Sequence, residues 1–168
     1  MFLLSRGLWL ILLEVVVVRF GLFFNFYFDV IVFQVIWAIG ASMICMAALI
    51  HLSHRVVLIV GLVIVFGHNI ADAAPLAPEN AFFGVWGFLR QTAFLNTGSG
   101  TVLWVPYPLL PWLGIMLLGF SLGKLYTDFS AEKRQRLLFR IGAAAVILFI
   151  ILRLINAYGD PAPWRPQK

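Results

Sequence analysis

The sequence predicts an all-α fold, a polytopic membrane helix bundle with about five transmembrane helices that residues 1–168 form as a single domain. Hydrophobic residues make up 62% of the chain, charged residues make up only 11%, and the mean hydropathy is +0.99. A water-soluble core could not hide this much apolar surface. The apolar runs are continuous and lack the alternation of barrel strands, so they favour helices over a transmembrane β-barrel.

The expected spans follow from the lengths of the apolar runs. A hydrocarbon core about 30 Å thick requires about 20 helical residues at a rise of about 1.5 Å per residue. Runs close to this length occupy residues 8–28, 30–50, 55–72, 109–127 and 136–157. The start of the first run resembles the apolar part of a signal peptide, but Glu14 lies within it, Arg19 closes it and no small-residue cleavage site follows. We therefore expect a retained helix.

Basic residues between the spans predict the orientation, because Lys and Arg near helix ends favour the cytoplasm. One side collects Arg6, Arg55, Lys124, Lys133, Arg134 and Arg136, and the other collects Arg90, Arg165 and Lys168. We expect a multi-pass protein of the cell inner membrane with a cytoplasmic N-terminus and an extracytoplasmic loop at residues 73–105. The lipid bilayer is the expected partner, and the net charge of +5 gives no reason to expect nucleic acid.

The loop at residues 73–105 combines residues that interrupt regular structure with aromatic side chains. Its prolines and glycines predict an irregular segment that lies on the membrane surface or folds back as a lid. Trp and Phe suit the headgroup boundary, so Trp86 and its Phe neighbours favour an interfacial anchor over a substrate clamp.

Two charged residues lie inside the first expected span. Glu14 and Arg19 are five positions apart, which is about 140° around an α-helix, so they cannot comfortably pair with each other. A charge at mid-membrane costs at least about 2.5 kcal/mol, so each is expected to have a partner on another helix, in polar surroundings. Two interpretations stay open: a structural ion pair that locks helices together, or a role in a site.

The third expected span ends in a polar cluster, Gly67-His68-Asn69-Ile70-Ala71-Asp72. His68 and Asp72 are four apart and share one face of an α-helix, the spacing at which a carboxylate holds an imidazole in one tautomer and raises its basicity. The pair is a candidate for a base and its orienting group. The alternative is a satisfied histidine near a helix end.

The fourth and fifth expected spans carry packing signals and a polar end. Gly119 with Gly123 is a pair of small residues that allows close approach of another helix, as Ala38 with Ser42 is in the second span. Near the end of the fifth span, Arg153 and Asn156 share a face, where an arginine suits a carboxylate, a phosphate or a developing oxyanion. Arg153 could equally extend to the headgroups or pair with Glu14 or Asp72.

Neither cysteine nor histidine predicts a metal site. The one cysteine, Cys45, lies within a span and is expected to be a packing residue. His51 and His54 on the cytoplasmic side do not supply a full set of metal ligands, and His68 with Asp72 does not either. We expect no metal and no tightly bound cofactor.

Five separated motifs together resemble a bacterial membrane-protein family related to the catalytic domain of heparan-alpha-glucosaminide N-acetyltransferase. The motifs are Arg6 to Phe20, Gln34 to Gly40, Gly67-His68-Asn69 with Asp72, Tyr107 to Gly114, and Arg153 with Asn156-Ala-Tyr-Gly-Asp160-Pro closing at Trp164. The resemblance covers nearly the whole chain. It implies an acyltransferase that passes an acetyl or other acyl group from acyl-CoA, with acetyl-CoA as co-substrate, to an extracytoplasmic acceptor such as an envelope glycan.

Burial cost and spacing suggest roles for residues of the polar ends, at positions that the resemblance supports. His68 and Asp72 are expected near the acceptor, where they position or deprotonate an amine or hydroxyl. Anionic parts of donor or acceptor are expected to bind Arg19, Arg153 and Asn156. The other expected substrate-binding residues are Asn69 and Asp160, and Glu14 is the expected structural charge partner. The alternatives are a non-catalytic structural membrane subunit and a small transporter.

One departure from the family concerns the acetyl-transfer histidine. In the family, further helices precede the segment that matches Phe2 to Asn25, and this histidine lies among them. Its role therefore transfers to none of His51, His54 and His68, and we expect the chain to be part of a larger family domain. Additional helices or a homo-oligomer are the expected protein partners.

Overall fold

The computed structural model describes residues 1–73, 76–156 and 158, without the side chains of residues 71–73. Helices dominate, which confirms the largely helical fold. In chain order the elements are α1 (Phe2–Leu13), the π-helical turn η1 (Glu14–Val18), α2 (Arg19–Phe23), β1 (Val30–Val32), α3 (Val35–Leu49), α4 (His54–Gly67), the 3-10 helix η2 (His68–Ala73), α5 (Phe83–Leu89), β2 (Ala93–Asn96), β3 (Val102–Val105), α6 (Leu109–Asp128) and α7 (Ala131–Ile155).

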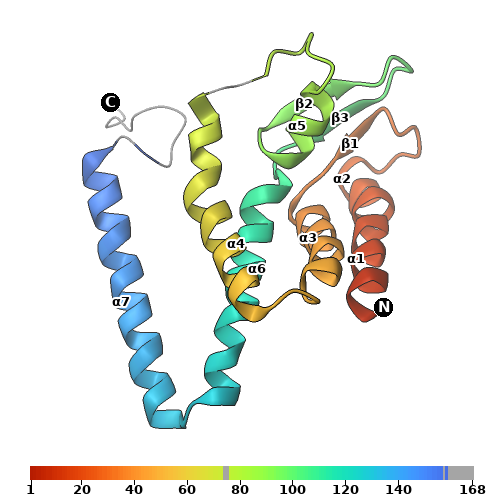
Figure 1. Ribbon diagram of the computed structural model, residues 1–168. Helices are drawn as coiled ribbons and strands as arrows, with labels where there is room; N and C mark the ends of the chain where they lie inside the picture. The colour runs from red at the N-terminus through yellow and green to blue at the C-terminus, as the bar shows by residue number, and fades with distance from the viewer. Residues whose placement is uncertain (74–75, 157, 159–168) are drawn as a thin grey trace.

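The long elements run alternately in opposite directions (Figure 1). The chain rises through α1, η1 and α2, descends through α3, rises through α4, descends through α6 and rises again through α7. The three strands and α5 form a small cap at one end of this bundle. The N-terminus, the α3–α4 connection and the α6–α7 turn lie at the opposite end, which we call the basic end.

The prediction of about five continuous membrane spans is wrong in its details. Within the described residues, two helices are long and apolar enough to cross a bilayer, α6 with 20 residues and α7 with 25. α3 has 15 residues, and the apolar helix that starts at His54 is also shorter than a full span. The first span was expected at residues 8–28, but the helical segment begins at Phe2, contains the π-helical turn, and ends where Phe24 adopts a left-handed conformation with φ of 50°.

The all-α prediction missed a three-stranded sheet of order β1-β3-β2. β1 takes the first residues of the second expected span and pairs in parallel with β3, and β2 pairs with β3 in the antiparallel direction. Short apolar runs do not distinguish strand from helix, which is why Val30-Ile-Val was assigned to a span. The loop at residues 73–105 is likewise not irregular, because it contains α5 and a hairpin that turns through Gly98 and Gly100 at positive φ.

Two helix pairs make the packed part of the bundle. α1 and α3 cross where Gly7 meets Gly40, and a Cβ added to Gly7 would lie 2.6 Å from the Gly40 carbonyl oxygen. α4 and α6 meet at Gly61 and Gly114, and Leu117 of α6 is fully buried there beside Val57. α7 differs from these helices, because none of its residues is buried in the part of the chain that the structure describes.

Candidate functional site at the cap end of the bundle

Glu14 is completely buried, at the point where α1 passes into its π-helical turn. Its Oε2 accepts a hydrogen bond of 3.0 Å from the backbone N–H of Trp37, in the first turn of α3. The first N–H groups of a helix have no partner within the helix, and negative charge is favourable there. Glu14 therefore caps α3 from a neighbouring helix. π-helical turns of this kind are frequent at functional sites.

Arg19 is also enclosed, with an exposed fraction of 1%. Its Nη2 donates to Asp29 Oδ1 at 2.8 Å, its Nε donates to the Val30 carbonyl at 3.2 Å, and its Nη1 donates to the Asn25 carbonyl. The expectation that Arg19 pairs with a residue on another helix is wrong, because its charge partner is Asp29, in the connection from α2 to β1. As expected, that partner is not Glu14. Sequence reasoning missed Asp29, although it is the acidic residue that follows the aromatic run.

The guanidinium of Arg19 lies between two aromatic rings of the same segment. Its Cζ is 5.2 Å from the ring centre of Phe23 and 4.8 Å from that of Phe28. Arginine favours such positions over aromatic faces, especially away from water. Arg19 therefore ties residues 24–30 to the end of α2, and its donors are engaged within the chain.

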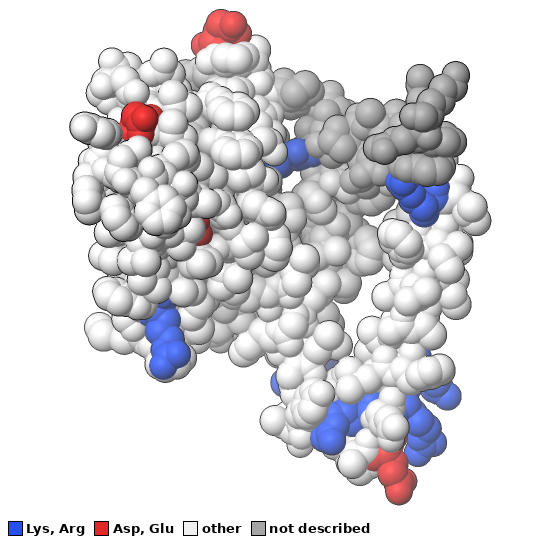
Figure 2. Space-filling model, turned by 180° about the vertical axis from the view of Figure 1, so that it is seen from behind, with Lys and Arg blue, Asp and Glu red and all other residues white. Residues whose placement is uncertain are grey.

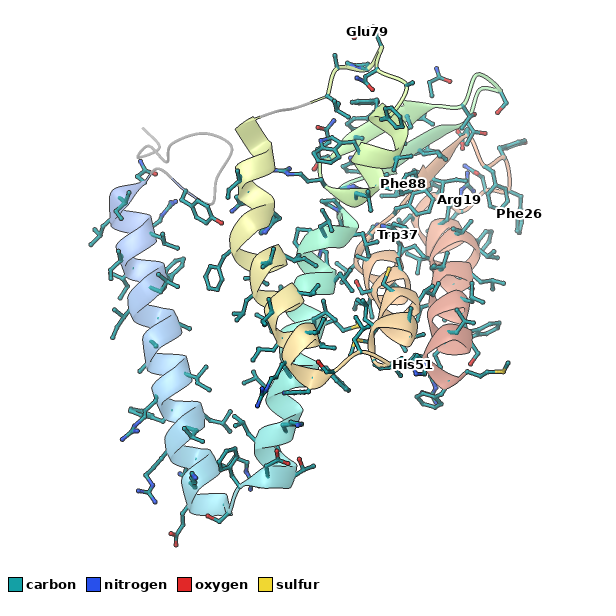
Figure 3. The ribbon with its side chains drawn as sticks, in the orientation of Figure 1. Arg19, Phe26, Trp37, His51, Glu79 and Phe88 are labelled. Carbon is teal, nitrogen blue, oxygen red and sulfur yellow. The ribbon has the colours of Figure 1, made fainter. Side chains whose placement is uncertain are left out.

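An aromatic cluster joins α3 to the cap. Phe33, Trp37 and Phe88 form a triangle of edge-to-face contacts with ring centres 5.1 to 5.4 Å apart. The indole N–H of Trp37 donates to the Tyr107 carbonyl at 3.2 Å, just before α6 begins. Trp37 and Phe88 point toward each other in Figure 3, with Arg19 to one side of them. Trp37 therefore has two roles: its backbone N–H binds Glu14, and its ring contacts Phe88 of the cap.

His68 follows the end of α4 and turns its ring back onto that helix. Its Nδ1 lies 2.9 Å from the Ile64 carbonyl oxygen and 3.1 Å from that of Val65. Carbonyl oxygens only accept hydrogen bonds, so Nδ1 carries a proton, and in the neutral imidazole Nε2 then holds the lone pair. The backbone of α4 therefore fixes the tautomer that leaves Nε2 available as a base.

The expected pairing of His68 with Asp72 rested on α-helical spacing. Residues 68–73 form a 3-10 helix with about three residues per turn, so positions four apart are rotated by about 120° from each other. The premise that the two residues share a helix face is therefore wrong at the backbone level. The side chain of Asp72 lies outside the described part of the chain. Asn69 lies in the same 3-10 helix and is half-buried.

Arg90 is a buried residue of this region that sequence reasoning did not select. It closes α5, is 8% exposed, and donates from Nε to the His68 carbonyl at 2.9 Å. Burial lowers the pKa of its guanidinium from the ordinary value. A cation is favourable at this place because the C-terminal end of a helix carries partial negative charge. The signal in the sequence was a lone arginine in an apolar, aromatic segment.

Two further residues that the sequence predicted for the site, Arg153 and Asn156, lie at the C-terminal end of α7. Asn156 adopts a left-handed conformation with φ of 50° and closes α7 with a hydrogen bond of 3.0 Å from its N–H to the Leu152 carbonyl. Arg153 lies in the last turn and is exposed. Beyond the helix, the hydroxyl of Tyr158 donates to the Phe66 carbonyl. Asp160 lies outside the described residues.

The C-terminal end of α4 thus gathers side chains from distant parts of the sequence. Carbonyls at the C-terminal end of a helix can accept hydrogen bonds from side chains outside it. Here the Nδ1 of His68 donates to the carbonyls of Ile64 and Val65, and the hydroxyl of Tyr158 donates to the Phe66 carbonyl. The Nε of Arg90 donates to the carbonyl of His68 itself. We call this group of His68, Arg90 and Tyr158 the α4 terminus cluster. Glu14 and Arg19 belong to the separate contact between α1, α3 and the cap.

A pocket of about 440 Å³ opens in the cap. Its lining combines two amide side chains with aromatic and small residues, namely Pro78, Asn80, Phe83, Gly84, Phe94, Leu95 and Asn96. The amide oxygens of Asn80 and Asn96 accept backbone hydrogen bonds of 2.9 and 3.0 Å from Phe82 and Gly98. Their NH₂ groups remain to donate to a ligand. Among the described residues, no three His, Cys, Asp or Glu side chains gather as metal ligands would.

The fold and its polar cluster define a helical membrane protein with polar side chains gathered at one end of the bundle. A family model described as heparan-alpha-glucosaminide N-acetyltransferase, catalytic, matches residues 3–154. The chain belongs to this family, as the sequence motifs indicated. Searches of the curated proteins and of the solved structures found no match.

Proposed function

We propose that this chain forms part of a membrane acyltransferase that moves an acetyl or other acyl group from acyl-CoA to a sugar or another extracytoplasmic acceptor. The observation that carries the proposal is the family match over residues 3–154. Acetyl-CoA is the proposed co-substrate. In the reaction, the acceptor amine or hydroxyl gives up a proton as it bonds to the acyl carbon, and the thioester bond breaks to release the CoA thiol.

His68 is the residue that we propose as the base near the acceptor. Its Nδ1–H is directed into the end of α4, so Nε2 is the nitrogen that can take the acceptor proton. Asp72 remains the proposed acidic helper, although 3-10 geometry places it on another face of the backbone. Arg90 supports His68 through its carbonyl and so acts as a positioning residue.

The proposed substrate-binding residues are those at the polar ends of α4 and α7. Asn69, Arg153, Asn156 and Asp160 enter the proposal as contacts to the acyl donor or the acceptor. Arg19 was expected to join them, but its donors already bind Asn25, Asp29 and Val30. In the proposal Arg19 and Glu14 therefore act structurally, by holding the cap on the bundle.

The cap pocket supports a sugar as the acceptor class. Pyranose rings present apolar faces to aromatic side chains and hydroxyls to amide groups, and Phe83, Phe94, Asn80 and Asn96 supply both kinds of contact. In the proposal the acceptor binds on the cap side, which requires the cap to face the exterior of the cell inner membrane. The N-terminus and the basic end would then be cytoplasmic, as the excess of Lys and Arg there favours. Further helices or a second copy would complete the larger domain.

The test is incorporation of labelled acetyl from acetyl-CoA in membrane vesicles. Vesicles with this chain alone are compared with vesicles that hold a longer chain with the family's upstream helices, each with and without His68→Ala. His51→Ala is the matched control, because His51 is exposed in the α3–α4 connection, far from the cap (Figure 3).

The proposal expects label in the longer chain, a loss of about 100-fold with His68→Ala, and no change with His51→Ala. Unchanged transfer in His68→Ala would remove this residue from the mechanism. Absence of label from both chains would favour a structural subunit or a transporter.

A further inference from the structure

A second pocket lies at the basic end of the bundle, away from the α4 terminus cluster. It has a volume of about 440 Å³ and is formed where the α3–α4 connection meets the last turns of α6. Its lining residues are Ile50, Leu52, His54, Phe120, Gly123, Lys124 and Thr127. We call it the basic-end groove. No role for it follows from the acyl-transfer proposal.

The lining of the groove has an apolar part and a polar part. Ile50, Leu52 and Phe120 are exposed by 38%, 46% and 47%, so they offer apolar surface that the described chain leaves uncovered. Lys124 adds a cation, and the hydroxyl of Thr127 bonds to the Lys124 carbonyl at 3.2 Å and to Asp128 at 2.6 Å. A ligand that matches this lining has both an apolar part and an anionic part.

The surroundings of the groove carry strong positive charge. α7 begins beside it with Lys133, Arg134, Arg136 and Arg140, and Arg55 lies in the first turn of α4. Figure 2 shows Lys and Arg side chains gathered around the α6–α7 turn, with few acidic ones among them. Clusters of this kind attract the anionic lipids of a membrane surface, and basic pockets between membrane helices bind their headgroups.

The shape of the groove depends on a glycine. Apart from the neighbouring backbone of α6 itself, no atom of the described residues lies within 4 Å of a Cβ built on Gly123, and the same holds for Gly119 one turn earlier. Gly123 lines the groove and Gly119 does not. A side chain at position 123 would therefore fill the groove without disturbing the packing of the bundle, and position 119 offers the matched control.

We propose that the basic-end groove binds an anionic phospholipid. The phosphate is held by Lys124 at the rim, and an acyl chain lies along Ile50, Leu52 and Phe120. A lipid fits better than a soluble anion because the groove is at the end of the long apolar helix α6, where headgroups meet hydrocarbon. Charge complementarity selects anionic over zwitterionic headgroups.

The experiment measures lipids that stay bound to the purified chain. The full chain is extracted from vesicles of equal parts phosphatidylglycerol and phosphatidylcholine, and bound lipid is counted by native mass spectrometry. Gly123→Leu and Lys124→Gln are compared with Gly119→Leu and Lys133→Gln. Circular dichroism confirms that each variant is folded.

The wild type is expected to retain phosphatidylglycerol in preference to phosphatidylcholine. Lys124→Gln should lower its retention about fivefold, the effect of removing one cation near an anionic surface, and Gly123→Leu should abolish it. Gly119→Leu should behave as wild type, and Lys133→Gln, which removes a cation of the surroundings and not of the lining, should lower retention by less than Lys124→Gln does. Equal retention of the two lipids would overturn the proposal, and so would equal losses in Lys124→Gln and Lys133→Gln, which would indicate diffuse surface charge. Displacement of the lipid by an equimolar amount of acyl-CoA would assign the groove to the donor instead.

Discussion

The α1–α3 pair and the α6–α7 pair are both antiparallel and both contain glycine in apolar sequence, yet only one of them is packed. Gly7 and Gly40 bring the backbones of α1 and α3 so close that a Cβ on either would lie within 2.7 Å of the other's carbonyl oxygen. On α6 and α7, a Cβ built on Gly119, Gly123 or Gly142 meets no atom of the described residues within 4 Å, apart from the neighbouring backbone of its own helix. Small residues therefore permit close approach of helices but do not decide which helices meet.

Adding a methyl group at the close contact between Gly7 and Gly40 should have the largest effect on stability. Gly40→Ala places a methyl group 2.7 Å from the Gly7 carbonyl oxygen, and a backbone atom cannot move aside as a flexible side chain can. We expect it to lower the free energy of unfolding by about 1–3 kcal/mol. Gly119→Ala, in open space on α6, should change it by less than about 0.5 kcal/mol. Denaturant unfolding in detergent, followed by tryptophan fluorescence, measures both, and equal effects would contradict the comparison.

Removing the Glu14 carboxylate from the N-terminal end of α3 should have the next largest effect on stability. Glu14→Ala deletes the acceptor for the Trp37 N–H and leaves a buried donor unpaired. The expected loss of stability is about 1–2 kcal/mol. Glu132→Ala is the control, since Glu132 lies in the first turn of the exposed helix α7. If both variants unfold at the same denaturant concentration, Glu14 does not stabilise the α1–α3 contact.

Breaking the ion pair between Arg19 and Asp29 should have a smaller effect on stability. Asp29→Asn removes the charge partner of Arg19, whose guanidinium is 1% exposed, but Asp29 itself is 61% exposed and well hydrated. We expect a loss of about 1 kcal/mol, together with faster amide exchange in residues 24–30. Hydrogen exchange detected by mass spectrometry resolves that segment. Unchanged exchange there would show that the carbonyl contacts of Arg19 suffice.

Releasing α7 should have the smallest effect on stability and the clearest effect on geometry. Tyr158→Phe removes the hydrogen bond to the Phe66 carbonyl and should change the free energy of unfolding by less than about 0.5 kcal/mol. The distance between α4 and α7 should nevertheless broaden. Spin labels at the exposed positions Val63 and Phe149, in a Cys45→Ala background, report that distance. An unchanged distribution would mean that other contacts position α7.

The two long helices were predictable from the sequence because their signals are local. α6 was expected at residues 109–127 and is Leu109–Asp128, after a proline at its N-cap. α7 was expected at residues 136–157 and is Ala131–Ile155, with its start extended through the charged residues after Ser130. The sheet was missed because Val30-Ile-Val pairs with a strand about 70 residues later in the chain, a partner that no local pattern reveals.

The sequence by itself determined the helical membrane character, the excess of positive charge between the expected spans and the family. These follow from hydropathy, from charge and from motifs read along the chain. Only the tertiary structure decided which groups the polar residues contact: Glu14 with the Trp37 amide, Arg19 with Asp29, and Arg90 with the His68 carbonyl. Such contacts depend on how separate elements approach each other, and spacing along one helix carries no information about the neighbour that it faces.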